Sequence, residues 1–233
     1  MPTGLTTIRR GHQVDGGSNW FGHMLREVRG VTKAGVAPFE VSFGFVTDEH
    51  YFLAKDNHDN RYGHDVPAKM ADAIAVFNTR PLDFVLNGGD IVEHYGETRQ
   101  QALDELATIV GVFNTTTAPR YHTVGNHDLD LLHFSEFVAA TGIDPQGYYS
   151  FDVPGKLHVV VLDCMYLADD DVSHEDANGN VLVDTYHIGP AQRTWLAADL
   201  AATSLPTLVM CHCWLSGDGS DYVANAAAVR NIL

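Results

Sequence analysis

Apolar residues follow two alternating spacings from residue 39 onward. Short apolar runs predict buried strands, at residues 39–46, 83–86 and 120–124. Between these runs, apolar residues recur every three or four positions. This spacing predicts helices, one beginning at Pro67 and one over residues 98–113. The order favours parallel βαβ units and an α/β fold, in which ligands bind beyond the carboxyl ends of the strands.

The second half of the chain has a different pattern. Residues 148–153 and 157–163 predict a hairpin, because a Pro-Gly turn signal separates two apolar runs. A Gly-Pro pair then begins a predicted helix at Pro190, and residues 206–211 predict the last clear strand.

The first 38 residues show no regular spacing. We predict an N-terminal extension of unclear role over residues 1–38, with at most a short amphipathic helix or turn around Trp20-Phe21 and Met24-Leu25. The remainder contains neither a repeat nor a linker. We therefore expect a single domain over residues 39–233.

Composition limits the classes of protein to consider. The chain has 233 residues, enough for a substantial core, and its 45% apolar content is typical of a globular domain. The net charge of −16 disfavours nucleic acid as a partner, because phosphate backbones require clustered Lys and Arg. No apolar run reaches transmembrane length and the first residues lack a signal-peptide core, so we expect a cytoplasmic protein without a membrane partner. A signal peptide removed beforehand would leave the same pattern.

Three cysteines, Cys164, Cys211 and Cys213, cannot all pair within one chain. We expect small buried residues rather than a disulfide framework. We also expect Cys211 and Cys213 to point to opposite faces of their strand, so that they do not bind a metal together with His212.

Polar clusters follow the three strands predicted in the first half, and another closes the last strand. They hold carboxylates, imidazoles and an amide, which are ligands for hard and borderline cations. The candidate metal ligands are Asp48, His50, Asp90, Asn126 and His212. Because strand ends meet at one edge of a sheet, we expect these side chains to form a two-metal site, whose ions usually lie about 3.5–4 Å apart.

Individual roles follow from residue type and position. Asp48 and His50 are two residues apart, so at a strand end both can point into the same cleft. Asp90 is the candidate bridging ligand, because a carboxylate has two oxygens to share. The two glycines before Asp90, Gly88 and Gly89, allow a sharp turn and a close approach of the backbone.

His127 and Asp128 are the candidate catalytic residues. His127 is expected to face the substrate, where it donates a proton to the leaving group or stabilises phosphoryl charge. Asp128 is expected to orient His127. The nucleophile would be a water activated by both cations. A mononuclear zinc enzyme, such as an amidohydrolase, is an alternative that does not explain why Asn126 directly precedes His127.

The order of these clusters resembles the calcineurin-like metallophosphoesterase superfamily. Its pattern is Asp-x-His, Gly-Asp, Gly-Asn-His-Asp/Glu, a lone His and then Gly-His-x-His, and the match runs from about Phe39 to the last residue. Residues 47–51 and 83–85 look like the branch containing ADP-ribose/CDP-alcohol diphosphatase-like and alkaline-phosphatase-like members.

The resemblance implies a four-layer α/β/β/α sandwich and a small phosphorylated substrate such as a nucleotide. It implies that Asp48 and His50 bind one metal, that Asn126 and His212 bind the other, and that Asp90 bridges them. His127 would then assist catalysis. The ligands suit manganese, iron and zinc alike.

One part of the family pattern is missing, because no Gly-His-x-His occurs in the chain. We therefore expect a domain that is incomplete at its C-terminus and binds metal weakly. Two functions follow from this. The first is a phosphomonoesterase or phosphodiesterase, and the second is a catalytically impaired phosphate- or nucleotide-binding protein. The sequence does not predict the oligomeric state.

Overall fold

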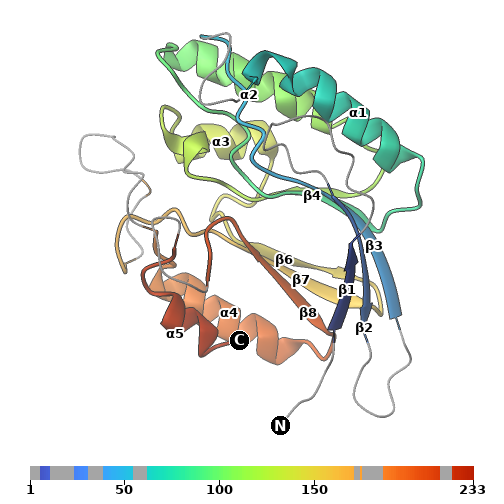
Figure 1. The fold of residues 1–233 in the computed structure, drawn as a ribbon. Helices are drawn as coiled ribbons and strands as arrows, with labels where there is room; N and C mark the ends of the chain where they lie inside the picture. Colours follow the sequence, from blue (N-terminus) through green and yellow to red (C-terminus); the bar gives the residue numbers. More distant parts are fainter. Residues whose placement is uncertain are drawn as a thin grey trace.

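The computed structural model describes residues 6–10, 24–30, 39–54, 62–170, 174, 186–215 and 222–233. Within these residues the strands form two sheets that face each other, and helices cover the outer face of each sheet (Figure 1). This is the α/β/β/α order that the resemblance implies. None of the helices described combines the length and apolar character needed to cross a bilayer.

The first sheet has the spatial order β1-β2-β3-β4-β5. Its strands are β1 (Thr6–Arg10), β2 (Met24–Gly30), β3 (Phe39–Val46), β4 (Phe84–Asn87) and β5 (Arg120–His122). β3, β4 and β5 are parallel to one another, whereas β1 and β2 are antiparallel to their neighbours. The helices of this half are α1 (Val66–Asn78), α2 (Arg99–Phe113) and α3 (Phe134–Thr141). The predicted βαβ units are confirmed, with α1 and α2 as the crossovers.

The N-terminal residues contribute to this sheet. The helix or turn that we predict around Met24-Leu25 is wrong, because Met24 begins β2, which pairs with β3 along its whole length. The apolar pair at residues 20–21 lies outside the described residues. The spacing of Met24 and Leu25 was too short to distinguish a helix from a strand.

The second sheet has the order β6-β7-β8. It consists of β6 (Tyr149–Val153), β7 (Leu157–Leu162) and β8 (Thr207–Cys211), and its helices are α4 (Pro190–Ala202) and α5 (Ala226–Arg230). The predicted hairpin is confirmed as the antiparallel pair β6 and β7, and β8 is parallel to β7. The predicted helix at Pro190 is also confirmed.

Side chains from both sheets form the core between them. This apolar cluster contains Val41, Phe43, Phe84, Leu86, Val153, Leu157, Val159 and Val161. Successive strand residues face opposite sides, so Val160 and Leu162 of β7 instead join the cluster that contains the helices. Both faces of β7 are therefore buried, as expected for a strand between a sheet and a helix layer.

The parallel arrangement explains where the polar clusters meet. In the register of the first sheet, Val46 at the end of β3 pairs with Asn87 at the end of β4, and Asn87 pairs with His122 at the end of β5. The chain leaves all three strands at the same edge. The next residues of each strand therefore begin close together, which builds the site described below.

Candidate metal centre

The loops after β3 and β4 have an unusual backbone at three of the candidate ligands. Asp48, His50 and Asp90 have φ values of 58°, 49° and 58°, and they are the non-glycine residues with positive φ in the described part of the chain. This left-handed conformation costs of order 1–3 kcal/mol per residue, and it persists where surrounding structure enforces it. Such strain concentrates at functional sites.

Backbone hydrogen bonds between the two loops enforce this conformation. The N–H groups of Asp48, His50 and Tyr51 donate to carbonyl groups in the loop after β4, each at 3.0 Å. Asp48 and His50 do point into the same cluster, and Glu49 turns away to accept a hydrogen bond from Asn87 at 2.8 Å. Asp48 and His50 share this direction because their backbone is left-handed, and not because side chains alternate along an extended strand.

Glycines allow the loops after β4 and β5 to approach each other. A Cβ on Gly125 would lie 2.3 Å from both the nitrogen and Oδ1 of Asp90. A Cβ on Gly89, which has a φ of 94°, would lie 2.7 Å from the nitrogen of Gly125 and 2.9 Å from Nδ1 of His212. Glycine at both positions is therefore required for the ligands to converge.

The structure brings all five candidate ligands together around Asp90. Oδ2 of Asp90 lies 3.7 Å from Nε2 of His50 and 3.4 Å from Nε2 of His212. Nε2 of His50 also lies 3.8 Å from Oδ1 of Asp48, and Nε2 of His212 lies 3.2 Å from Oδ1 of Asn126. One carboxylate oxygen therefore stands between two ligand groups, and this donor set fits two cations that share Asp90.

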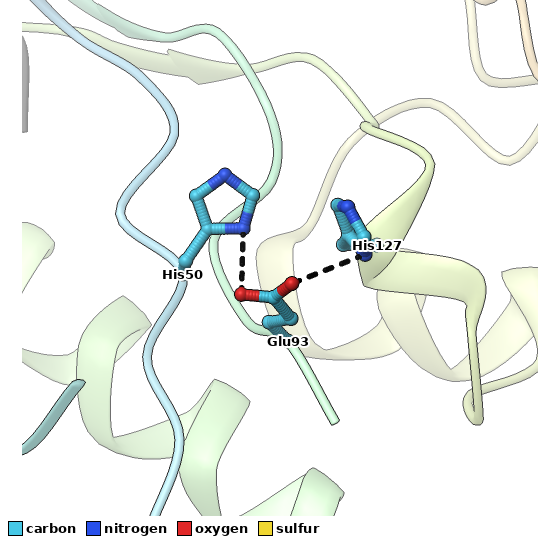
Figure 2. Close-up of side chains that lie close together, drawn as sticks. All are labelled: His50, Glu93 and His127. Atoms are coloured by element: carbon cyan, nitrogen blue, oxygen red, sulfur yellow. Dashed lines mark ion pairs between the residues drawn. The ribbon is translucent and has the colours of Figure 1, made fainter. Parts of the chain in front are cut away.

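A polar group on the far side of each imidazole sets its orientation. Nδ1 of His212 lies 2.8 Å from the carbonyl oxygen of Gly88. A carbonyl oxygen can only accept, so Nδ1 carries a proton and a neutral ring leaves the lone pair of Nε2 for a cation. Nδ1 of His50 faces Oε2 of Glu93 at 3.3 Å in an ion pair (Figure 2), so Nδ1 of each ring has an oxygen beside it and Nε2 of each points towards Asp90.

Glu93 is a site residue that our sequence analysis missed. Its side chain is only 5% exposed, and its two oxygens face Nδ1 of His50 and Nδ1 of His127, the latter at 3.8 Å (Figure 2). The available signal was a carboxylate placed directly after the apolar pair Ile91 and Val92, which are both fully buried. A charged residue beside such a pair needs a buried partner.

The charges of the centre stabilise one another. Burial opposes ionisation of Asp90 and raises its pKa, but the charge and hydrogen bond of His212 outweigh burial and hold the pKa below its usual range. Burial lowers the pKa of His212, but the charge of Asp90 and the hydrogen bond to it raise the pKa by more, to well above the ordinary value. A cation that takes the place of this proton would keep Asp90 compensated, because ligand imidazoles must be neutral.

His127 lies beside the ligands without belonging to the five. Its backbone N–H donates to Oδ1 of Asp90 at 2.9 Å, and its ring meets the ring of His50 edge-on, with centroids 5.1 Å apart. Its side chain is 28% exposed, so a substrate can reach it. Burial lowers the pKa of His127, but the hydrogen bond to Asp130 and the charge of Asp90 raise it by more.

The structure contradicts the role that we predict for Asp128. Its buried carboxylate accepts hydrogen bonds at 2.8–3.2 Å from the backbone N–H groups of Asp90, Ile91, Val92 and Gly125. Asp130 instead contacts the His127 ring, with Nδ1 and Oδ2 2.7 Å apart. His127–Leu129 form a 3₁₀ turn, in which side chains three residues apart lie above one another and adjacent ones do not.

The prediction for the cysteines also needs correction. Cys211 and Cys213 both contact the thiol of Cys164, which accepts the backbone N–H of Cys213 at 3.3 Å. Residues two apart in a strand share a face, so our expectation of opposite faces misapplied the period. All three thiols are free, as we expect.

Comparisons with known proteins identify the family of this chain. Residues 41–233 match the family model described as calcineurin-like phosphoesterase. A manganese-dependent ADP-ribose/CDP-alcohol diphosphatase from Arabidopsis thaliana is 32% identical over 130 residues, which cover 52% of this chain and 42% of that protein. The chain thus matches less than half the length of this relative.

A solved structure shares the fold. The crystal structure of a dimetal phosphatase from Danio rerio superposes with a TM-score of 0.65 at 17% identity, covering 82% of this chain and 76% of the other. The family match includes the strands of both sheets from β3 to β8 and every candidate ligand. This chain belongs to the calcineurin-like phosphoesterase family.

Proposed function

We propose that this protein hydrolyses phosphoesters of small molecules, using two cations held by Asp48, His50, Asp90, Asn126 and His212. The observation that carries the proposal is the position of Oδ2 of Asp90, which lies 3.7 Å from Nε2 of His50 and 3.4 Å from Nε2 of His212. A mononuclear site would not need a carboxylate between two separate ligand groups.

The residues present fit divalent cations. Each side of Asp90 offers an imidazole nitrogen, which a cation would bind in place of a proton, and a further oxygen donor, from Asp48 on one side and Asn126 on the other. Bound cations would polarise the phosphoryl oxygens and lower the pKa of the attacking water. Manganese is our first choice, because the plant relative is named for its dependence on it. The ligands suit iron and zinc as well.

The side chains of the site supply the remaining chemistry. His127 has a raised pKa and reaches solvent, so it can carry a proton to the oxygen of the leaving group. Asp128 rigidly holds the loops that carry Asp90 and Gly125, because its carboxylate binds backbone N–H groups on both.

The proposed substrate class is a nucleotide-linked phosphate. The name of the plant relative includes ADP-ribose and CDP-alcohols, which are diphosphate diesters. The net charge of −16 would repel such anions, so binding must be local to the cations. The chain would therefore bind these substrates only when it is loaded with metal.

The decisive experiment combines elemental analysis with a substrate panel. The purified chain is loaded with manganese, dialysed and assayed on nitrophenyl phosphate, bis-nitrophenyl phosphate, ADP-ribose and CDP-choline. We expect about two ions per chain and turnover of at least one substrate. Asp90→Ala should abolish both, whereas Asp72→Asn, a change on the exposed side of α1, should alter neither.

The assay distinguishes a phosphoester hydrolase from a protein that only binds phosphate. No rate above that of Asp90→Ala, together with retained binding of inorganic phosphate, would overturn hydrolysis and leave a phosphate-binding protein.

A further inference from the structure

We propose that the protein has an alternative cation position, in which Nδ1 of His50, the carboxylate of Glu93 and Nδ1 of His127 bind zinc. This position shares His50 with the two-metal centre proposed above, so zinc bound there would inhibit the enzyme. The inhibition rests on the proposed function, whereas the position itself is defined by the geometry of three side chains (Figure 2).

The three donor groups lie within reach of one ion. Their ligand atoms are all within 4.8 Å of one another. Oε2 of Glu93 lies 3.3 Å from Nδ1 of His50 and Oε1 lies 3.8 Å from Nδ1 of His127, so the carboxylate stands between the two rings (Figure 2). Bonds of about 2.0–2.2 Å to zinc at tetrahedral angles place two ligand atoms about 3.3–3.6 Å apart. The two distances to Glu93 therefore suit a shared zinc ion after a small shift of the His127 side.

The position is enclosed and carries negative charge. The side chains of His50 and Glu93 are 7% and 5% exposed, whereas that of His127 is 28% exposed and gives access from solvent. Oδ2 of Asp130 lies 2.7 Å from Nδ1 of His127 and places a second carboxylate beside the ion. Buried carboxylates are costly unless they are paired or bind a metal. A divalent cation would compensate both of them.

The ring of His50 cannot serve both positions at once. Its Nε2 lies 3.8 Å from Oδ1 of Asp48 and 3.7 Å from Oδ2 of Asp90, on the side of the two-metal centre. Its Nδ1 faces Glu93 instead. A neutral imidazole has a lone pair on one nitrogen and a proton on the other. The ring therefore binds a cation through Nε2 in one state and through Nδ1 in the other, and the two positions exclude each other.

The two donor sets favour different cations. The two-metal centre offers His50 together with the carboxylates of Asp48 and Asp90, and oxygen ligands of this kind suit manganese. The alternative position offers two imidazoles and one carboxylate, a set that is found in catalytic zinc sites. Zinc also binds such ligands more tightly than manganese does. Zinc therefore favours the position at Glu93 and His127, and manganese favours the position at Asp48 and Asp90.

Zinc at the alternative position would stop the proposed hydrolysis in two ways. It withdraws His50 from the cation that Asp48 and Asp90 also bind. It also holds the ring of His127 in its neutral form, because a ligand imidazole must be neutral. A neutral ring lacks the second proton, so His127 can no longer supply a proton to the leaving group. The ratio of zinc to manganese would then set the activity.

Anomalous diffraction decides where each metal lies. Crystals of the manganese-loaded chain are soaked in zinc, and data are collected at the absorption edges of both metals. We expect a zinc peak between His50, Glu93 and His127, together with loss of the manganese peak beside Asp48. Zinc that only replaces manganese around Asp90, with no peak at His127, would overturn the proposal. If the wild-type chain hydrolyses nothing, the proposed function fails and this measurement still decides the position.

A zinc titration tests the inhibition. The rate of the manganese-loaded protein should fall as zinc is added and should recover when excess manganese displaces it. In Glu93→Gln, the zinc concentration that halves the variant's own rate should rise at least about tenfold, because loss of a partner in a metal site costs about 10–100-fold in affinity. Equilibrium dialysis with zinc gives the same comparison without an activity assay. Asp72→Asn, on the exposed side of α1, is the control and should keep the wild-type value. An unchanged value in Glu93→Gln would refute the assignment.

Discussion

Gly125→Ala changes one hydrogen into a methyl group at the most crowded point of the site. The added Cβ would lie 2.3 Å from the nitrogen and from Oδ1 of Asp90. Neither atom is free to move, because the nitrogen donates to Asp128 at 2.9 Å and Oδ1 accepts from the N–H of His127 at 2.9 Å. The methyl group must therefore displace the loop that carries the bridging carboxylate.

The size of the effect follows from overpacking. Forcing a methyl group into a filled space costs about 1–3 kcal/mol, which lowers Tm by about 2–4 °C per kcal/mol in a chain of this size. Gly111→Ala is the matched control, because the same change in α2 meets nothing within 4 Å. It removes a glycine from a helix and should stabilise the protein by about 0.5–1 kcal/mol.

Two assays separate stability from metal binding. Urea unfolding in EDTA gives the free energy of unfolding for the wild type and both variants, and calorimetric titration with Mn²⁺ gives the affinities. We expect Gly125→Ala to lose at least about tenfold in manganese affinity, the equivalent of 1.4 kcal/mol, while Gly111→Ala keeps it. Wild-type stability and affinity in Gly125→Ala would refute the claim that this contact fixes Asp90.

Three further predictions test other parts of the structure. Asp128→Ala leaves four buried N–H groups without acceptors, so the free energy of unfolding should fall by at least about 3 kcal/mol; a loss below 1 kcal/mol would contradict this role. Asn126→Ala should weaken one manganese ion selectively in a binding titration, and equal loss of both would contradict the two-site assignment. Burial, with a smaller effect of Arg120, lowers the pKa of His122 to about 3. The unfolded chain takes up this proton near pH ~6.5, so stability is lost from there down towards pH 3 by up to about 1.4 kcal/mol per unit. His122→Leu should flatten this slope in urea unfolding, and an unchanged slope would refute the assignment.

The fold was predictable where the hydrophobic pattern was long and regular. The spacing from residue 39 onward predicts β3, α1, β4 and α2, because their apolar faces must be buried in one core. Strand ends followed by ligand-type residues also predict the convergence of Asp48 and Asp90, because a parallel sheet brings such ends to one edge. His212 follows β8 of the second sheet, so its approach to Asp90 depends on how the two sheets pack and not on that edge.

The contacts of the carboxylates around the candidate ligands were not predictable in the same way. Asp128 lies directly after His127 in sequence, which suggests that the two side chains are in contact. Because of the 3₁₀ turn, Asp130 contacts the His127 ring instead. Glu93 acts on His50 across two loops, and no local spacing reveals such a contact. These assignments depend on turn geometry within a few residues, which sequence spacing describes poorly.

The ligand loops are held by hydrogen bonds of their own, in addition to the apolar core between the sheets. Asp128 ties the loop after β4 to the loop after β5, and backbone pairs tie the loop after β3 to the loop after β4. These bonds hold Asp48, His50 and Asp90 in left-handed conformations that the free chain disfavours. Core substitutions between the sheets should therefore lower Tm with little change in metal affinity. Substitutions in the loop network should lower both, because ligand geometry and backbone strain depend on the same hydrogen bonds.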